Sequence, residues 1–594
     1  MRRSYKRKIT LPNEEINPSG RVFFIYLGFI VLFAVLTVRL FDLQVLKHEE
    51  YRALAEVTHS TKATLLPQRG LIYTQDKDKE KIAVAINKKY WSLYAVPKEI
   101  EDPQKASEAL APYVPLKKEE IFNRLNKEGD PYEPLVNRIE DEELMNIIKE
   151  LAIKGIYFKE ERFRYWPFNS LLSQTIGFVS EGEDGKIKGR YGLESYYEDI
   201  LSGQPGEFSG VRDALGRLIY SLFSSNKAPV EGANLITTID KNVQSKSEEA
   251  LENLIKGRGA VKGSIIVMEA KSGRILALAN WPTFNLNKFN EIKDYSVYKN
   301  YAVEEMYEPG SVIKPLTMAA GIDLKKVTPE TTYDDKGYFE TGGYRINNYR
   351  NEVYGKNVTM TKVLERSINT GAIFVGQKVG MQNLREYFKK FGLDEKTGID
   401  LPNEITGDLS NLEYPKANPT YLATASYGEG ITVTSVGLIR AYSAFLNEGK
   451  MVNPYIVEAI EDSNGVYHSI DQPEQKQVIS RETAQTLTTM LVSVIENGFG
   501  GNAKIKGYSL GGKTGTAQIP LFGKGGYSDD QIHTFVGFFP ASNPRFLILV
   551  KMDKPIDPNS AASHTVTLAF KEVEQFLINY YNIPPDEPLK LTNN

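Results

Sequence analysis

The sequence predicts an α+β enzyme domain that follows a membrane-spanning segment and a separate N-terminal region. Three observations predict this arrangement. A run of residues without charge lies near the N-terminus. Strand-like segments occur at both ends of the region after residue 231, with helix-like segments between them. Inside that region, Ser311 and Lys314 stand at the start of an apolar segment.

The length and composition limit the classes of function. The chain has 594 residues, which is too many for one hydrophobic core, and 41% of them are hydrophobic and 25% charged, as in a globular protein. The net charge of −3 gives no reason to expect nucleic-acid binding. There are no cysteines, and the five histidines lack the spacing of a metal site. We therefore expect no metal and no cofactor, and we expect any serine chemistry to use a lysine as its base.

A membrane anchor is predicted near the N-terminus. Residues 1–21 are basic, and residues 22–38 contain no charge. Apolar residues continue to about residue 44, so we expect a spanning helix over 22–44 in which Arg39 reaches the interface. The basic flank argues against a buried core helix, and the lack of a small-x-small pattern argues against a cleaved signal peptide. The positive-inside rule then makes residues 1–21 a short cytoplasmic tail and puts the chain after about residue 45 outside.

Residues 45–230 form a predicted N-terminal domain without a candidate active site. Residues 64–73 and 82–86 have the pattern of strands around a turn, and the charged stretch 117–153 has the periodicity of solvated helices. Another helical stretch begins at Tyr191 and ends near Gly203. We interpret Arg69-Gly70 and Gly192-Leu-Glu194 as structural rather than catalytic.

From about residue 231 the pattern becomes that of a second domain. Its predicted strands are 234–240, 264–268, 274–279, 514–519, 534–539 and 546–552, and its first and last predicted helices are 243–254 and 562–580. A short polar turn with Gly273 indicates that 264–268 and 274–279 form a β-hairpin. Strands from both ends of the region would form one mixed sheet, with a helical layer that carries Ser311.

Ser311 and Lys314 have the spacing of a nucleophile and its base. Pro309 and Gly310 indicate a turn, and Ser311 stands where an apolar helix would begin. Residues three apart lie on one face of a helix, so Lys314 could take the proton of the Ser311 hydroxyl if its pKa is lowered. The helix N-terminus also offers free backbone N–H groups to an oxyanion.

Two later motifs add chemistry to this pair. Ser367-Ile-Asn369 lies in the helical run 361–379 and supplies a hydroxyl that can relay a proton and an amide that can hold a carbonyl. Lys513-Thr-Gly-Thr516 opens a strand and supplies a cation, a glycine that lets the backbone approach a substrate, and two hydroxyls suited to a carboxylate. The edge of such a strand can bind an extended peptide.

Each motif alone is a weak signal, because each also occurs elsewhere in the chain. The other occurrences are Ser224–Lys227, Ser296–Lys299, Ser224-Ser-Asn226 and Lys396-Thr-Gly398. A turn or a surface cluster explains any one of them. The order, spacing and context of the three motifs together favour Ser311, Ser367 and Lys513.

The three motifs resemble those of the penicillin-binding transpeptidases. The matching segments are Glu308-Pro-Gly-Ser-Val-Ile-Lys-Pro315, Ser367-Ile-Asn369 and Lys513-Thr-Gly-Thr-Ala-Gln518. Segments 39–44, 69–72 and 192–194 look like the N-terminal dimerisation domain of class B members, and segments 281–285, 426–430 and 535–540 look like transpeptidase landmarks. No glycosyltransferase domain is apparent, so the resemblance implies the monofunctional class B type of these bacterial proteins.

That resemblance implies an α+β fold with two domains after the anchor. A mixed α/β pedestal, or dimerisation domain, would span residues 45–230. A transpeptidase domain similar to serine β-lactamases, with an antiparallel sheet packed with helices, would span 231–582, and a C-terminal tail would span 583–594.

The resemblance also implies a role for each motif residue. Ser311 would attack the penultimate D-alanine carbonyl of a peptidoglycan stem peptide that ends in D-Ala-D-Ala, and Lys314 would take its proton. Ser367, with Lys513, would pass a proton to the departing D-alanine, and Asn369 would hold the substrate amide. The N–H groups of Ser311 and Thr516 would form the oxyanion hole. The substrate carboxylate would lie along Thr514, Gly515 and Thr516. The two lysines, if close together, would lower each other's pKa.

The leading hypothesis is an anchored peptidoglycan D,D-transpeptidase that crosslinks the cell wall in cell division or in the maintenance of cell shape. Its substrates would be peptidoglycan stem peptides, with an amine of a neighbouring peptide as acceptor, and β-lactams would be inhibitors. The implied partners are a membrane-embedded glycosyltransferase and division or elongation proteins. The alternatives are a D-alanine carboxypeptidase, a β-lactamase, or a non-catalytic β-lactam sensor or scaffold. The large N-terminal region and the anchor argue against the first two.

Overall fold

The computed structural model describes residues 20–47, 60–183, 185–212, 218–219, 226–413, 418–521, 526–557 and 560–586. The basic residues before Gly20, Ser224 and the chain after residue 586 lie outside the described residues. The chain divides into two compact units: the first comprises residues 1–67 and 204–230, and the second comprises 68–203 and 231–594. Each unit is described separately below.

The first unit contains a long apolar helix and a small sheet. Helix α1 (Gly20–Phe41) continues into the π-helical turn η1 (Asp42–Leu46). The segment Phe23–Leu46 has 24 residues and a mean hydropathy of 2.4, which is long and apolar enough for a single membrane-spanning helix. The antiparallel sheet consists of β1 (Ser60–Leu65), β8 (Gly206–Arg212), β9 (Leu218–Ile219) and β10 (Asn226–Lys227).

In the second unit, one sheet combines strands from distant parts of the chain. Its order is β22 (Tyr467–Ser469), β21 (Val457–Glu461), β11 (Asn234–Asp240), β2 (Ile72–Gln75), β3 (Lys81–Ala95) and β4 (Glu133–Ile139), and β5 (Ile156–Tyr165) also pairs with β3. Strand β11 was expected in the transpeptidase sheet. Instead it pairs in parallel with β2 and antiparallel with β21.

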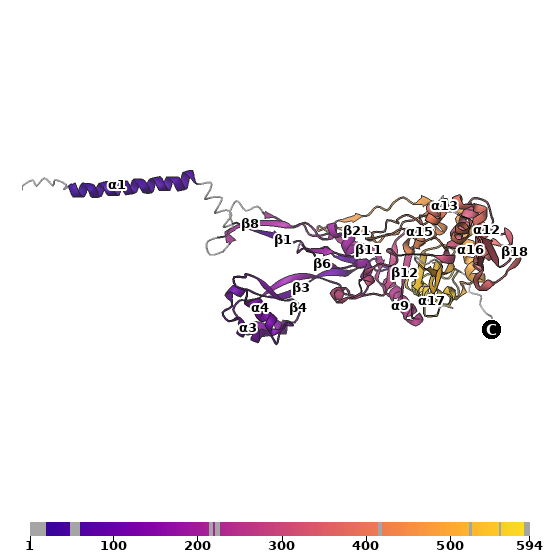
Figure 1. Cartoon of the computed structure of the whole chain (residues 1–594), viewed down its shortest axis with the longest axis horizontal. Helices are drawn as coiled ribbons and strands as arrows, with labels where there is room; N and C mark the ends of the chain where they lie inside the picture. Colours follow the sequence, from indigo (N-terminus) through magenta and orange to yellow (C-terminus); the bar gives the residue numbers. More distant parts are fainter. Residues whose placement is uncertain are drawn as a thin grey trace, which may run out of the picture. The chain divides into compact units, whose positions relative to one another are not determined.

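Three amphipathic helices cover the far end of this sheet. They are α3 (Pro103–Leu110), α4 (Lys118–Leu125) and α5 (Glu142–Glu150), and Figure 1 shows α3 and α4 beside β3 and β4. Their apolar faces share a core with Leu93, Leu135 and Ile139 of the strands. The charged residues of α4 and α5 are exposed or half-buried on the opposite faces. The prediction of helices over 117–153 is therefore correct at both ends of the range but wrong for residues 133–139, which form β4 and include the buried Glu133.

A buried ion network ties the start of β2 to the segment around residue 194. Arg69 contacts Glu194 at 2.6 Å and Glu198 at 2.7 Å, and Arg164 contacts the other oxygen of Glu194 at 2.6 Å. Glu194 is fully buried. Gly70 packs directly on the carbonyl of Ala233, where a Cβ would lie 1.8 Å from the oxygen. These contacts agree with the structural interpretation of both short motifs.

The second sheet of this unit is antiparallel throughout. Its order is β13 (Ile275–Trp281), β12 (Lys262–Glu269), β26 (Phe546–Asp553), β25 (Tyr527–Phe539) and β24 (Gly511–Pro520). Strands from both ends of the region do meet, as expected. The mixed sheet that the strand pattern suggested is wrong here, since each neighbouring pair is antiparallel.

Helices cover both faces of this antiparallel sheet. Ile265 and Val267 of β12 belong to a core with α9 (Lys241–Arg258) and α17 (Val566–Tyr580), which pack on one face (Figure 1). Ile266 and Met268 point to the other face and share a core with α10 (Lys314–Asp323), α15 (Ser435–Leu446) and α16 (Arg481–Asn497). Successive residues of a strand point to opposite faces, so a strand buried on both faces is apolar at every position.

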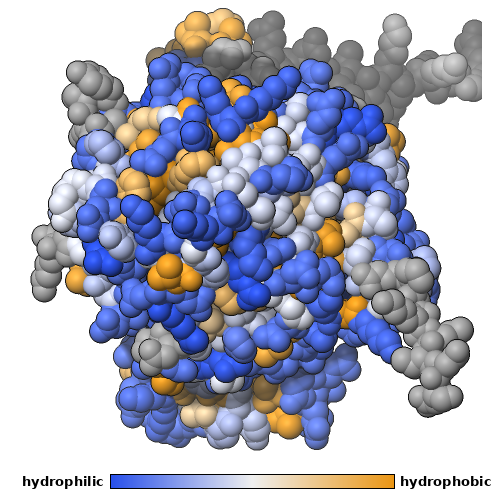
Figure 2. Space-filling model, turned by 90° about the vertical axis from the view of Figure 1, so that its right-hand side faces the viewer, coloured by the Kyte–Doolittle hydropathy of each residue, from blue (hydrophilic) through white to orange (hydrophobic). Residues whose placement is uncertain are grey.

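The remaining elements surround these layers. They are η2 (Pro97–Glu99), α6 (Ser173–Ile176), β6 (Val179–Glu181), β7 (Ile187–Gly189), α7 (Gly192–Tyr196), α8 (Glu198–Leu201), η3 (Leu286–Glu291), η4 (Tyr295–Tyr298), β14 (Met306–Tyr307), η5 (Gly310–Ile313), β15 (Thr332–Asp335), β16 (Tyr338–Thr341), β17 (Tyr344–Asn347), η6 (Tyr349–Asn351), β18 (Gly355–Thr359), α11 (Met360–Glu365), α12 (Asn369–Val379), α13 (Met381–Lys390), η7 (Ser410–Leu412), α14 (Pro419–Ala425), β19 (Val433–Thr434), β20 (Lys450–Met451), β23 (Lys476–Gln477), η8 (Gly501–Ala503) and η9 (Ala562–His564). The face in Figure 2 is largely polar, with apolar side chains scattered over it.

Candidate active site

Ser311 lies in a tight turn that leads into a helix. It belongs to the 3-10 turn η5, and the α-helix α10 begins only at Lys314, three residues later than the sequence suggested. A 3-10 helix has three residues per turn, so Ser311 and Lys314 still lie on one side. Gly310 has a φ of +59°, and its N–H donates to the carbonyl of Gly428 at 2.9 Å. Ser311 is half-buried, and its hydroxyl has no hydrogen bond within the described residues.

The side chains of Lys314 and Lys513 converge on the hydroxyl of Ser367. Lys513 Nζ donates to Ser367 Oγ at 2.9 Å, and Lys314 Nζ lies 3.2 Å from the same oxygen. Lys314 also donates to Ser367 O at 2.5 Å and to Asn369 Oδ1 at 2.7 Å. Both lysines are almost completely buried, at 1% and 0% exposed. The structure thus brings together four of the residues that the three motifs singled out.

Burial changes the protonation of both lysines. Loss of solvation lowers the pKa of Lys314 well below its usual value, the charge of Lys513 lowers it further, and Glu429 opposes the change. Burial also lowers the pKa of Lys513 to about 7. Amines with such lowered pKa values can be neutral near neutral pH, which a lysine base requires.

Ser367 and Asn369 stand at a break between two helices. The run 361–379 was predicted as one helix, but it forms α11 and α12, and Ser367 between them has a left-handed φ of 53°. This conformation is uncommon for a non-glycine residue and is often found at functional sites. The break turns the Ser367 hydroxyl toward the two lysines, which a continuous helix would not do.

A buried polar network fixes the first turn of α12. Thr370 Oγ1 donates to Asp335 Oδ1 at 2.6 Å, and Thr370 N donates to Asn348 Oδ1 at 3.1 Å. Asn348 in turn donates to both oxygens of Asp335 at 3.1 Å. Asn369 Nδ2 donates to the carbonyl of Asn347 at 3.0 Å. The amide oxygen of Asn369 is therefore held where it accepts from Lys314.

Strand β24 passes directly against the turn that carries Ser311. A Cβ on Gly515 would lie 2.9 Å from the carbonyl oxygen of Pro309 and 3.0 Å from a methyl of Val312. Only a glycine therefore fits at this position without a shift of the turn. Thr514 is buried and Thr516 is half-buried. Thr516 Oγ1 accepts a hydrogen bond of 3.4 Å from the N–H of Ala562.

Two carboxyl groups were not among the sequence candidates: Glu429, whose charge acts on Lys314, and Glu308, three residues before Ser311. Tyr427 donates to Glu429 at 2.9 Å, and Tyr527 donates to Glu308 at 3.1 Å. Burial raises the pKa of both carboxyl groups, that of Glu308 to about 7. Glu429 lies in segment 426–430, which was recognised only as a segment similar to transpeptidase domains and not as part of the site. The sequence could not predict that Glu429 lies near Lys314, because more than 100 positions separate the two residues.

Two of the other occurrences of the motifs lie in ordinary turns, while those that begin at Ser224 start outside the described residues. Ser296 is in η4, where its N–H donates to Asp294 Oδ1 at 2.9 Å. Thr397 is buried and donates to Glu404 at 2.6 Å, so Lys396-Thr-Gly398 is a structural turn. Within the part of the chain that the structure describes, no group of three or more His, Asp and Glu residues could hold a metal ion.

The fold and this arrangement of groups define a class of enzyme that transfers acyl groups through a serine, with lysines in place of histidine. Family models agree on the kind of domain. Residues 263–573 match the penicillin binding protein transpeptidase domain, and residues 64–237 match the penicillin-binding protein dimerisation domain. The chain belongs to the penicillin-binding protein transpeptidase family, as a class B member.

Individual relatives span most of the chain. It is 33% identical to stage V sporulation protein D of Bacillus subtilis over 90% of this chain and 82% of that protein. It is 30% identical to the probable peptidoglycan D,D-transpeptidase PenA of Neisseria meningitidis over 98% of this chain and 97% of that protein.

Solved structures share the fold. Penicillin binding protein 2X from Streptococcus thermophilus has a TM-score of 0.72 at 23% identity, over 87% of this chain and 80% of that one. Penicillin binding protein 3 of Mycobacterium tuberculosis, in complex with aztreonam, has a TM-score of 0.68 at 24% identity, over 89% of this chain and 99% of that one.

Proposed function

We propose that this class B penicillin-binding protein is a peptidoglycan D,D-transpeptidase that acylates Ser311 with the D-Ala-D-Ala end of a stem peptide. The observation that carries the proposal is the convergence of two buried lysines on Ser367, next to a serine whose hydroxyl is free of hydrogen bonds within the described residues. β-Lactams would acylate the same serine.

Lys314 acts as the base in the first step. When its amine is neutral, it takes the proton from Ser311 Oγ while this oxygen attacks the penultimate D-alanine carbonyl. The N–H groups of Ser311 and Thr516 donate to the oxyanion. The close approach of Gly515 to Pro309 supports this assignment, because it brings β24 next to the turn.

Ser367 and Lys513 act on the leaving group. Ser367 Oγ accepts from Lys513 and lies near Lys314, so a proton taken from Ser311 has a path through this hydroxyl to the departing D-alanine amine. The substrate amide is held by Asn369. The terminal carboxylate lies along Thr514, Gly515 and Thr516, whose hydroxyls and backbone N–H groups can donate to it. An amine of a neighbouring stem peptide then attacks the ester and forms the crosslink.

The test is a product assay with the full chain in detergent. A stem peptide that ends in D-Ala-D-Ala is supplied with an amine acceptor, and the products are separated by mass. A crosslinked product from the wild type and none from Ser311→Ala would support the transpeptidase. Release of D-alanine without a crosslink would favour a carboxypeptidase. No turnover, with penicillin still bound, would favour a scaffold.

The apolar helix α1 fits a single-pass membrane anchor. We infer that residues 1–21 lie in the cytoplasm and that the transpeptidase domain, residues 231–582, lies outside. The pedestal, residues 45–230, binds partner proteins, of which a membrane glycosyltransferase and division or elongation proteins are the candidates. Because the chain has no cysteine, a single cysteine at Ser4 or at Ser410 can be labelled with an impermeant maleimide in intact cells without cell walls. Labelling at position 4 and not at 410 would overturn this orientation.

A further inference from the structure

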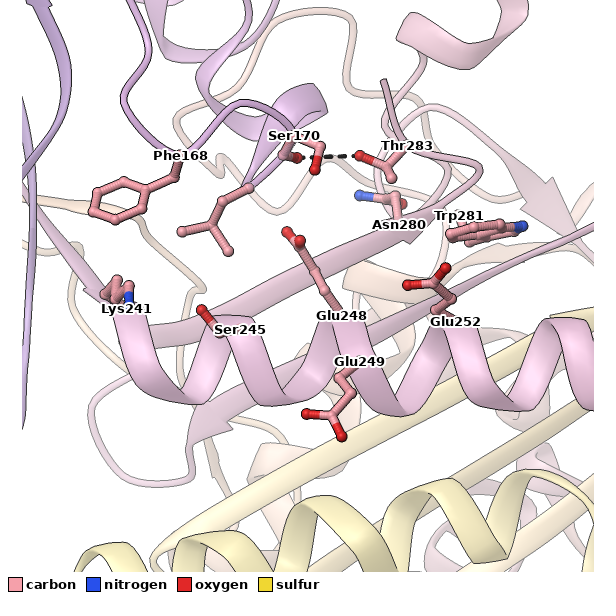
Figure 3. Close-up of a pocket in the computed structure, with 11 residues that line it drawn as sticks. Phe168, Ser170, Lys241, Ser245, Glu248, Glu249, Glu252, Asn280, Trp281 and Thr283 are labelled. Atoms are coloured by element: carbon pink, nitrogen blue, oxygen red, sulfur yellow. Dashed lines mark hydrogen bonds between the residues drawn. The ribbon is translucent and has the colours of Figure 1, made fainter. Parts of the chain in front are cut away.

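A pocket of about 330 Å³ lies between three segments of the second unit, away from the residues around Ser311. Figure 3 shows helix α9 along one side, the turn with Phe168 and Ser170 above it, and Trp281 and Thr283 at the other side. The size is at the lower end of the range for pockets that bind small ligands. The family match assigns no function to it.

Glu248 supplies an unpaired carboxyl group to this pocket. Figure 3 shows that its side chain points from α9 into the pocket, while that of Glu249 points away. Glu248 accepts from the N–H of Leu172 at 2.8 Å and from Gln244 Nε2 at 2.8 Å, and no cation pairs with it in the described part of the chain. The neighbouring acids are paired, Glu249 with Lys246 and Glu252 with Lys256. Glu248 is half-buried. A carboxylate that has lost part of its hydration and has no cation beside it is unfavourable, so a bound cation would stabilise it.

Asn280 belongs to the polar wall of the pocket. It is 4% exposed, lines the pocket, and donates from Nδ2 to Asn300 Oδ1 at 3.1 Å. Its Oδ1 and the Nδ2 of Asn300 are closed off from solvent, and neither atom has a hydrogen-bond partner among the described residues. The acceptor that a ligand in the pocket can reach is therefore the carboxyl group of Glu248.

The walls suit an apolar stem next to a positive charge. Trp281, Phe168 and Leu171 line the pocket. Ring faces attract cations, and two lysines already lie over these rings, Lys256 at 5.3 Å from the Trp281 centroid and Lys241 at 5.1 Å from that of Phe168. The pocket therefore combines hydrogen-bond acceptors, one free carboxyl group and aromatic surface.

We propose that this pocket binds a primary alkylammonium group, which donates hydrogen bonds to Glu248 while its carbon chain lies against Trp281. A free amine and the amino side chain of a wall peptide share this chemistry. The proposal does not depend on the roles given to Ser311 or to the lysines of the catalytic site.

Binding should depend on pH through Glu248. Burial raises the pKa of its carboxyl group to about 7, and Glu252 adds to that rise. The other charged side chains that line the pocket are Lys241, Glu249 and Glu252, all on α9. Glu249 points away, Glu252 is paired with Lys256, and the turn and β13 contribute neutral groups. A bound ammonium favours the ionised carboxylate, so affinity should increase as the pH rises through about 7.

The test is calorimetric titration of the full chain in detergent, with saturating benzylpenicillin present so that amine binding at the serine site does not contribute. The probe is n-pentylamine, and 1-pentanol is its neutral counterpart. We expect the amine to bind and the alcohol not to bind. Glu248→Gln should weaken amine binding by about tenfold or more and abolish its pH dependence, whereas Glu249→Gln, on the same helix but directed away, should match the wild type.

Equal binding of alcohol and amine, equal loss in both variants, or no binding by the wild type would overturn the proposal. Thermal melting checks that Glu248→Gln is folded, and the pH dependence of the wild type is decisive without any variant. A stem tripeptide that ends in lysine distinguishes a wall peptide from a free amine as the natural ligand. Its ε-acetylated form, which lacks the ammonium group, is the control. Tighter binding of the free tripeptide than of pentylamine identifies a wall peptide, and equal binding identifies a free amine.

Discussion

Lys513 donates a hydrogen bond of 2.9 Å to the hydroxyl of Ser367, and Lys314 lies 3.2 Å from the same oxygen. Two buried amines that share one acceptor cannot both carry a proton without strong repulsion. One of the two amines is therefore neutral and can accept a proton from Ser311.

The rate of acylation should rise with pH. Protonated Lys314 cannot take a proton, so the rate falls as the pH drops below the pKa of Lys314 and rises until the amine is neutral. In Lys513→Gln, Lys314 loses a positive neighbour, its pKa rises, and the residual rate should increase only at higher pH. The check is the second-order rate of acylation by a fluorescent penicillin between about pH 5.5 and 9. Lys506→Gln, at an exposed position nearby in sequence, should keep the wild-type profile, and a flat wild-type profile would refute the base role.

Removal of the shared acceptor should slow the chemistry. Ser367→Ala leaves both lysines without the hydroxyl, so we expect the rate of acylation to fall by about 100-fold or more. The fold should survive, because Ser367 is half-buried and lies between helices. Stopped-flow acylation measures the effect, and Ser410→Ala at a surface turn is the control. A rate within about twofold of the wild type would exclude a catalytic role for Ser367.

A methyl group at Gly515 should separate β24 from the nucleophile turn. In Gly515→Ala the added carbon would lie 2.9 Å from Pro309 O, so we expect a loss of about 1–3 kcal/mol in stability together with slower acylation. Gly257→Ala in α9 is the matched control, since nothing lies within 4 Å of the added carbon. Urea unfolding and penicillin labelling measure the two effects. Full activity of Gly515→Ala would show that the turn can move without cost.

Glu194 should be required for stability. It is fully buried between Arg69 and Arg164, so Glu194→Gln leaves two buried cations with one acceptor fewer, and we expect a loss of about 3–5 kcal/mol. Glu160→Gln removes a solvent-exposed ion pair with Lys89 and should cost about 0.5 kcal/mol or less. Denaturant titration compares the two. Equal small losses would mean that the buried network is not stabilising.

Local patterns predicted most of the fold but not its connections. The hairpin of β12 and β13, strand β26 and the second half of β25 are mainly apolar and were placed correctly. Strand β24 is not an apolar run, and it was placed from the segment that follows Gly511 and Gly512. The pairing of β11 with β2 was not predictable, because strand pairing over about 160 residues leaves no local signal. The break at Ser367 was missed because helical periodicity continues on both sides of it, while the left-handed residue there is an ordinary serine.

The candidate site was predictable in its parts and not in its electrostatics. Order, spacing and side-chain chemistry indicated Ser311, Lys314, Ser367, Asn369 and the strand motif, and the resemblance added the role of each residue. The two carboxyl groups at Glu308 and Glu429 were missed, since each is a common surface residue type and only the fold buries it. The pocket beside Glu248 could not be predicted from the sequence either, because its walls come from three separate segments.

The most direct test of the central claim is labelling of the membrane-bound full chain with a fluorescent penicillin. The wild type is compared with Ser311→Ala and with Ser296→Ala, which changes one of the other Ser-x-x-Lys patterns. We predict a labelled band near 66.8 kDa in the wild type and in Ser296→Ala, and none in folded Ser311→Ala. Equal labelling of Ser311→Ala would show that another residue is acylated and would contradict the account of the site.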